Sequence, residues 1–214
     1  MRVRAACVLC CIALASCARL DGSHVEALLA AFSGSRLAKI ANKLQPSYAS
    51  ADPFPHVVTS LSDLKIPADL FRRLADELPE QTNRAELNGT CHSSNCNCVT
   101  GLATCYWKHG KAGLADEDKF SAATRLVFAM LKSSPMLSFL SALTGIQHLL
   151  PDPHYEGSGV HSTTPNGHLA IHADFNRLNG PNLARRVNLF IFLNDQWPEE
   201  YGGHLELWDR NVTR

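Results

Sequence analysis

The chain contains 214 residues, 45% of them hydrophobic, and its 20 lysine and arginine side chains balance its 20 aspartate and glutamate side chains. A chain of this length and composition can bury one sizeable core, so we expect one compact domain with additional peripheral segments. The neutral charge balance gives no general attraction to nucleic acid or anionic lipid, and we expect no nucleic-acid partner.

The first residues, MRVRAACVLCCIALASCARLDGS, have the layout of a secretory signal peptide, which we place at residues 1–18. Their apolar stretch is too short to cross a bilayer, so we expect no membrane span. We expect the secretory pathway, in the endoplasmic reticulum or Golgi lumen or outside the cell, and glycosylation acceptor triplets at Asn88 and Asn211 agree with this route. An ordinary N-terminal helix is one alternative. A bacterial lipoprotein, with LASC ending at Cys17 as its cleavage box, is the other.

Residues 19–150 are predicted to form a helical support region. Apolar residues recur at helical spacing in four segments, residues 24–44, 65–80, 116–133 and 135–146. Gly145 stands where a left-handed C-terminal cap is expected.

A cysteine-rich stretch, residues 88–113, interrupts this region and is predicted to be an irregular inserted loop because it is rich in Asn, Ser, Thr and Gly. Its four cysteines are Cys91, Cys96, Cys98 and Cys105. In an oxidising compartment they favour two disulfides, with three connectivities open and the Cys96 to Cys98 pairing the least favourable geometrically. The alternative is a zinc site built from these thiolates and His92.

Residues 151–214 change to short extended segments separated by Gly, Pro and Asn, which predicts antiparallel β-structure. The nearly unbroken apolar run RRVNLFIFLN, residues 185–194, predicts a strand buried on both faces. Gly202 and Gly203 suit a tight hairpin before the alternating sequence HLELW. Helices followed by strands indicate an α+β fold with a jelly-roll-like core.

His172 and Asp174 occur in the sequence HLAIHADFN, two positions apart. In a strand such residues point to the same side, so an imidazole and a carboxylate could bind one ion together. With one more histidine they would form the facial triad that holds Fe(II) and leaves coordination positions open. The bare tripeptide is a weak signal, because the two residues can also simply form a surface hydrogen bond.

The surrounding sequence, GHLAIHADFNRLNGPNLARRVNLFIFLNDQWPEEYGGHLELWD, resembles the prolyl 4-hydroxylase-like branch of the 2-oxoglutarate- and Fe(II)-dependent dioxygenases. The resemblance extends over most of residues 52–209, apart from the cysteine-rich stretch. It implies a double-stranded β-helix core, incomplete at the C-terminus, in residues 151–214. It also implies Fe(II), 2-oxoglutarate as co-substrate and L-ascorbate, with His172 and Asp174 as two iron ligands.

The same resemblance makes residues 187–194 a wall of the 2-oxoglutarate pocket. Phe192 replaces a tyrosine whose hydroxyl contacts the co-substrate in many relatives, and His161 is either a polar pocket group or a histidine at a loop end. Arg185 and Arg186 are interpreted as strand caps or ion-pair partners. The family's second iron histidine and its 2-oxoglutarate Arg or Lys are not found before Arg214, so the chain is interpreted as a fragment.

His204, the only histidine after His172, is a weak substitute for the second iron histidine. The expected activity is hydroxylation of a prolyl residue or a similar C–H bond in a protein or small molecule, and the sequence leaves the oligomeric state open. A catalytically inactive secreted binding module is the main alternative. A cupin-like enzyme without 2-oxoglutarate is disfavoured because it predicts an H-x-H strand that the sequence lacks.

Overall fold

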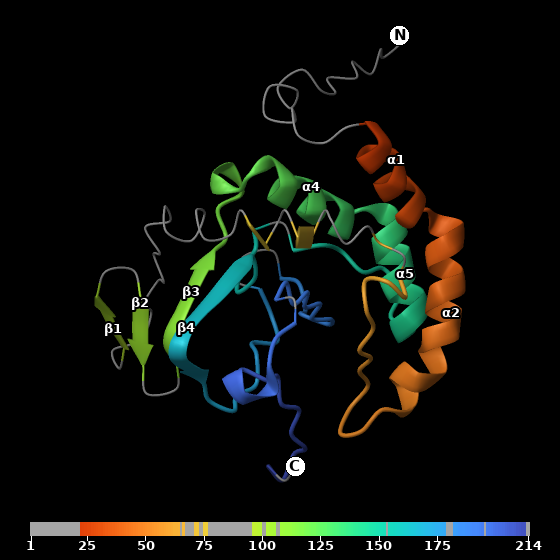
Figure 1. The fold of residues 1–214 in the computed structure, drawn as a ribbon. Coiled ribbons are helices and arrows are strands. Elements are labelled where there is room, and N and C mark those ends of the chain that lie inside the picture. The colour runs from red at the N-terminus through yellow and green to blue at the C-terminus, as the bar shows by residue number, and fades with distance from the viewer. Residues whose placement is uncertain are drawn as a thin grey trace.

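The computed structural model describes residues 22–64, 66, 71–72, 75–76, 96–99, 102–105, 108–152, 154–178, 182–194 and 196–212. Within these residues the chain forms helices and one antiparallel sheet, which confirms the α+β class (Figure 1). The predicted signal peptide at residues 1–18, Asn88, Cys91 and most of the helix predicted over residues 65–80 lie outside the described residues.

The helix predicted over residues 24–44 is in fact two helices, α1 (Gly22–Ala31) and α2 (Gly34–Ser50). Ser33 has an extended backbone at the N-cap position of α2, which separates the two helices. Phe32, beside the break, is buried. The interruption therefore lets both helices contribute to the same core.

The next two helices, α4 (Ala122–Leu131) and α5 (Ser134–Thr144), agree with the sequence pattern. The Ser121 hydroxyl caps α4 by accepting a hydrogen bond of 3.2 Å from the backbone N–H of Thr124. Gly145 ends α5 with a φ of 75°, which confirms the predicted left-handed cap. The short helix η1 (Glu117–Lys119) precedes α4.

In the part of the chain that the structure describes, no single helix is both long enough and apolar enough to cross a membrane. The helices α4 and α5 satisfy such a test only when taken together, and they are bent by 47° at their junction.

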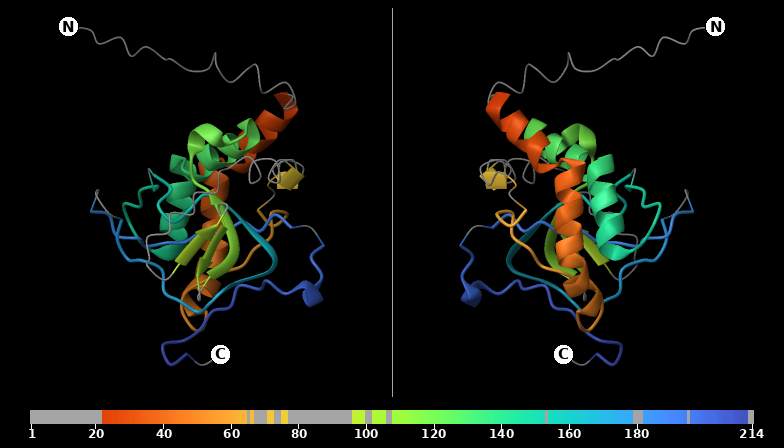
Figure 2. Two further views of the ribbon diagram at one scale, coloured as in Figure 1. Left: turned by 90° about the vertical axis from the view of Figure 1, so that its left-hand side faces the viewer. Right: turned by 90° about the vertical axis from the view of Figure 1, so that its right-hand side faces the viewer.

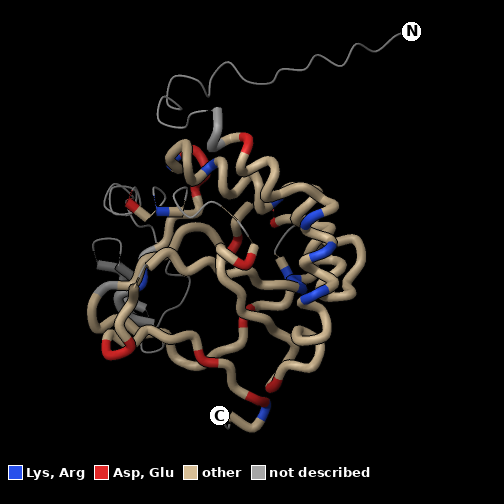
Figure 3. The backbone as a smooth tube through the Cα atoms, turned by 45° about the vertical axis from the view of Figure 1, so that its right-hand side comes forward, with Lys and Arg blue, Asp and Glu red and all other residues tan. Residues whose placement is uncertain are grey.

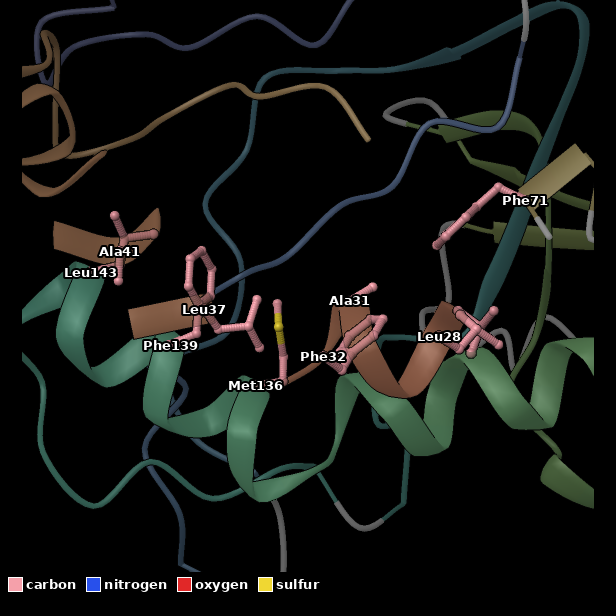
Figure 4. Close-up of a cluster of buried hydrophobic side chains, with 10 residues drawn as sticks. Leu28, Ala31, Phe32, Leu37, Ala41, Phe71, Met136, Phe139 and Leu143 are labelled. Atoms are coloured by element: carbon pink, nitrogen blue, oxygen red, sulfur yellow. The ribbon is translucent and has the colours of Figure 1, made fainter. Parts of the chain in front are cut away.

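The larger hydrophobic core lies between the helices. Figures 1 and 2 show α2 and α5 packed along each other on the side of the molecule away from β1 and β2. The buried side chains come from α1, α2, α4 and α5 together with Phe32 and Phe71. Most of them are seen in Figure 4: Leu28, Ala31, Phe32, Leu37, Ala41, Phe71, Val127, Met136, Phe139 and Leu143. A smaller cluster of Leu114, Phe120, Tyr155 and Val160 joins the sheet to α4 through Phe128.

The sheet has four antiparallel strands in the order in which they occur in the chain. They are β1 (Cys96–Val99), β2 (Leu102–Cys105), β3 (Lys108–Leu114) and β4 (Val160–Leu169). The prediction of an irregular loop over residues 88–113 is therefore wrong for its second half. The polar composition hid these strands because β3 pairs with β4, which lies far along the chain.

The prediction of a doubly buried strand over residues 185–194 is also wrong, because the described residues of this segment form no strand. Ile191 and Leu193 pack against the helical core, but Phe190 and Phe192 are 55% and 66% exposed. The apolar run thus covers the helices with one side only. Its continuous hydrophobicity indicated burial on both faces, but among the described residues no second layer covers the face that carries Phe190 and Phe192.

The hairpin predicted at Gly202 and Gly203 does not form either, since the described residues 196–212 contain no strand. The short helix η2 (Glu199–Tyr201) ends there instead, and both glycines have positive φ angles that turn the chain without pairing it. The indole N–H of Trp197 donates to the carbonyl oxygen of Gly202 over 2.8 Å and closes this turn. The four-stranded sheet does not by itself make a jelly roll.

Charged side chains are spread over the molecule, with one basic row on α2 (Figure 3). Arg36, Lys39 and Lys43 form this row, and the sequence of α2 contains no acidic residue. Asp63 of the following loop lies beside it and shares with Lys39 and Lys43 the lining of a cavity of about 220 Å³. The basic row is therefore partly balanced by a neighbouring carboxylate.

Candidate metal centre

His172 and Asp174 follow the end of β4 in a segment with no regular secondary structure. The prediction that they lie in a strand is wrong, but their side chains meet as the spacing implies. The Nε2 atom of His172 lies 3.4 Å from Oδ1 of Asp174, and both side chains are a little over one third exposed. A locally extended backbone places residues i and i+2 on one side even without a neighbouring strand.

The orientation of His172 is set by the backbone. Its Nδ1 atom lies 2.8 Å from the carbonyl oxygen of Ala170. Because a carbonyl oxygen only accepts hydrogen bonds, Nδ1 carries the hydrogen, and in the neutral ring the lone pair of Nε2 points toward Asp174. Metal-binding histidines use this arrangement, in which one ring nitrogen donates to a backbone carbonyl and the other binds the ion.

The distance between the two candidate ligand atoms suits a shared cation. Two atoms that each lie about 2.1 Å from one ion are roughly 3.0–3.5 Å apart when the angle between them is roughly 90–110°. The 3.4 Å separation of Nε2 and Oδ1 falls in this range. The nitrogen and oxygen donors also match the His and carboxylate ligands of an Fe(II) facial triad.

The second carboxylate oxygen of Asp174 is held by two other side chains. Its Oδ2 atom accepts a hydrogen bond of 2.6 Å from the side-chain amide of Asn188 and lies 3.3 Å from Nη2 of Arg185. Arg185 in turn donates from Nε to Oδ1 of Asn188 over 2.6 Å. The two oxygens of Asp174 thus have separate surroundings, with Oδ1 facing the histidine.

An open cavity of about 260 Å³ borders Asp174. Polar side chains of Asn176, Arg186 and Asn188 line it together with the apolar side chains of Phe175 and Val187. A small polar molecule could therefore lie next to the candidate ligand pair.

No third His, Cys, Asp or Glu joins this pair within the described ranges. His204 is exposed but forms no ligand group with His172 and Asp174. His161 lies in β4 opposite Gly113 of β3, and Phe192 is not among the residues that line the cavity. The structure therefore brings together His172 and Asp174 but leaves the roles suggested for His161 and Phe192 as predictions.

The remaining candidate residues are the cysteines and the glycosylation acceptors. The register of β1 and β2 places Cys96 opposite Cys105, and Cys98 opposite Ala103. Cys91 and His92 lie outside the described residues, and the side chains of Cys96, Cys98 and Cys105 are not described either, so the disulfides and the zinc site both remain predictions. Asn211 is exposed in a turn, as a glycosylation site requires.

Asn188 lies at the metal centre without having been predicted there, and Arg185 was predicted only as a strand cap or ion-pair partner. The ion pair is confirmed, and its partner is Asp174. The contact depends on a turn in which Arg177 and Ala184 form an isolated bridge. A polar Asn and Arg within an apolar run were the available signal, but the spacing alone could not identify their partner.

Comparison with known protein families points to the same segment of the chain. Residues 158–213 match the family model of the 2OG-Fe(II) oxygenase superfamily, and this range contains His172, Asp174, Arg185 and Asn188. The resemblance to 2-oxoglutarate- and Fe(II)-dependent oxygenases is thereby confirmed for this segment, whereas the match does not distinguish the prolyl 4-hydroxylase-like branch. No curated protein and no solved structure matches the chain.

Proposed function

We propose that this chain uses Fe(II), 2-oxoglutarate and dioxygen to hydroxylate an unactivated C–H bond, on a prolyl residue or a similar substrate. The supporting observation is the 3.4 Å separation of His172 Nε2 and Asp174 Oδ1 inside a segment that matches the 2OG-Fe(II) oxygenase superfamily. The double-stranded β-helix core predicted for residues 151–214 belongs to this proposal. L-ascorbate as reductant and the secretory pathway as the location are predictions that accompany it.

His172 and Asp174 would hold the iron in this function. The iron and 2-oxoglutarate supply oxidation of a C–H bond by dioxygen, with release of succinate and carbon dioxide. The contact of Nδ1 with the carbonyl oxygen of Ala170 would leave Nε2 of His172 as the nitrogen that faces the ion, beside one oxygen of Asp174.

The cavity beside Asp174 is our candidate site for a carboxylate-bearing co-substrate. Arg186 and the side-chain amides of Asn176 and Asn188 line it, and guanidinium and amide N–H groups bind carboxylates. Phe192 lacks the hydroxyl that many relatives place near 2-oxoglutarate. The proposed co-substrate contacts are therefore the arginine and amide groups of this cavity.

A second candidate function, a catalytically inactive secreted binding module, is favoured by one observation. Large apolar side chains are exposed along the C-terminal segment, namely Leu189, Phe190, Phe192, Trp197, Tyr201 and Leu205. Exposed apolar side chains in such number are typical of surfaces that contact another molecule. This function requires no metal binding.

Metal titration distinguishes the two functions. We expect the protein to bind Fe(II) under anaerobic conditions, and Mn(II) as a redox-stable substitute, and to release succinate from 2-oxoglutarate in air. His172→Ala and Asp174→Ala should abolish both, while His168→Ala, which removes an exposed histidine of β4, should retain both. His204→Ala tests the weaker ligand candidate. A wild-type protein that binds neither metal would refute the oxygenase and support the binding module.

A further inference from the structure

We propose that Arg185 and Asn188 are positioning residues that fix the carboxylate of Asp174 so that only Oδ1 is presented to a metal ion. The proposal rests on the proposed function, because it concerns the same ligand pair. It adds a claim about the mode of binding: Asp174 binds through one oxygen, and two side chains that do not touch the ion determine which oxygen that is.

The contacts form a closed ring of three side chains. Asn188 donates from Nδ2 to Oδ2 of Asp174 over 2.6 Å, and its Oδ1 accepts from Nε of Arg185 over 2.6 Å. Both contacts require the same orientation of the amide, because a guanidinium only donates and a carboxylate only accepts. The Nη2 atom of Arg185 completes the ring at 3.3 Å from Oδ2 of Asp174.

Arg185 is itself held in place. Its guanidinium carbon lies 4.5 Å from the centroid of the Phe175 ring, an arrangement that favours a cation over an aromatic face. The side chain of Arg185 is 19% exposed. Its backbone N–H also donates to the carbonyl oxygen of Asn176 over 2.9 Å, which ties the two arms of the turn together. An arginine fixed by ring, backbone and amide contacts can act as a rigid support.

Gly157 lies against both Phe175 and Arg185. A Cβ atom at residue 157 would lie 2.7 Å from Cε1 of Phe175 and 3.2 Å from Nη1 of Arg185. Only a residue without a side chain leaves space for both groups. The backbone of the segment before β4 thus packs closely against the two side chains, Phe175 and Arg185, that hold Asp174 in place.

The ring of contacts has a definite consequence for metal binding. A free aspartate can rotate and bind an ion through either oxygen or through both. With Oδ2 engaged by two donors, Oδ1 stays opposite Nε2 of His172, and the ion meets two ligand atoms already at a suitable separation. Partners of this kind that hold a metal ligand typically change metal affinity by about 10- to 100-fold.

Binding of Mn(II) to the full chain, followed by electron paramagnetic resonance, tests the proposal. We expect Arg185→Gln and Asn188→Leu to raise the Kd for Mn(II) about 10- to 100-fold and to alter the spectrum of the bound ion. Arg177→Gln is the matched control, since it removes an exposed positive charge of the same turn that does not line the cavity. It should leave the Kd within about twofold. The unfolding temperature of each metal-free variant shows whether the fold is retained.

Unchanged Mn(II) affinity in both Arg185→Gln and Asn188→Leu would overturn the proposal, as would an equal loss in Arg177→Gln. Crystal structures of the metal-free wild type and Asn188→Leu give a second readout that does not depend on metal binding. A carboxylate of Asp174 that is fixed in the wild type and turned in the variant supports the positioning role. An identical orientation in both refutes it. Failure of the wild type to bind Mn(II) refutes the proposed function, and the crystal structures still decide the positioning role.

Discussion

Gly157 and Phe175 lie so close that a Cβ atom at residue 157 would be 2.7 Å from Cε1 of the ring. Gly157 also has a φ of 70°, a conformation that L residues rarely adopt. Residue 157 must therefore be glycine for two reasons: its backbone is left-handed, and it lies close to the aromatic ring that supports Arg185.

Replacement of this glycine should damage both stability and the metal centre. We expect Gly157→Ala to lower the free energy of unfolding by about 2–4 kcal/mol, since left-handed strain and the clash with Phe175 add. It should also weaken Mn(II) binding, because Arg185 has to move. Chemical denaturation and metal titration measure the two effects.

Gly145→Ala is the control for this prediction. Gly145 has a similar φ of 75°, but a Cβ atom there meets nothing within 4 Å. Its replacement should therefore show only the backbone cost of about 1–2 kcal/mol and normal metal affinity. Equal losses of stability and affinity in the two variants would contradict the role of the close approach.

Gly159 makes an even closer approach to β3. A Cβ atom at residue 159 would lie 2.3 Å from the carbonyl oxygen of Leu114, the residue that pairs with Val160 at the start of β4. We expect Gly159→Ala to separate the ends of β3 and β4 and to destabilise the protein by at least about 3 kcal/mol. Denaturant unfolding checks this value, with Gly203→Ala as control because its φ of 77° is not accompanied by any atom within 4 Å. A loss no larger than that of the control would disprove the steric argument.

The sequence predicted the features that depend on local chemistry. Gly145 was identified as a helix cap because a left-handed residue after a helical pattern favours glycine. The side chains of His172 and Asp174 meet, as their i, i+2 spacing predicts, although no strand forms there. These predictions needed no knowledge of distant segments.

Other predictions failed because they depended on which segments meet. The pairing of β3 with β4 turned part of a polar cysteine-rich stretch into a sheet. The apolar run over residues 185–194 was expected to be covered on both sides, but only Ile191 and Leu193 contact the helical core. Asn188 reaches Asp174 across a turn. The hydrophobicity and residue spacing of a segment predict its local structure, but they do not predict which distant segment packs against it.

Two phenylalanines provide a direct test of the observed burial. Phe139 of α5 is 5% exposed in the helical core, whereas Phe192 is 66% exposed. We expect Phe139→Ala to cost about 3–5 kcal/mol of unfolding free energy and Phe192→Ala to change it by less than about 0.5 kcal/mol. Urea unfolding followed by circular dichroism compares them, since the two substitutions remove the same atoms. A large loss in Phe192→Ala would show that the segment is covered in solution.

Tyr155 should make the stability of the protein depend on alkaline pH. Its side chain packs edge-on against the rings of Phe120 and Phe128, and its hydroxyl has no hydrogen-bond partner among the described residues. Burial raises the pKa of Tyr155 above its ordinary value, although the Lys132 ammonium, 4.4 Å from the ring centroid, acts in the opposite direction.

Tyr155 should make the folded protein less stable at alkaline pH, because the folded and unfolded states release its proton at different pH values. The unfolded chain loses the Tyr155 proton near a pH of about 10, while the folded protein retains it to higher pH because its pKa is raised. The stabilising contribution is therefore complete below that pH and is lost as the pH rises through the folded pKa.

We expect Tyr155→Phe to lose less stability than the wild type between roughly pH 9 and 11. At pH 7 the substitution should change stability by no more than about 1 kcal/mol, because it removes a buried hydroxyl without a described partner. Denaturant unfolding across this pH range measures the difference, and Tyr201→Phe, at a tyrosine that is 65% exposed, should follow the wild type. Parallel pH curves for the wild type and Tyr155→Phe would show that the folded environment leaves the tyrosine pKa unchanged.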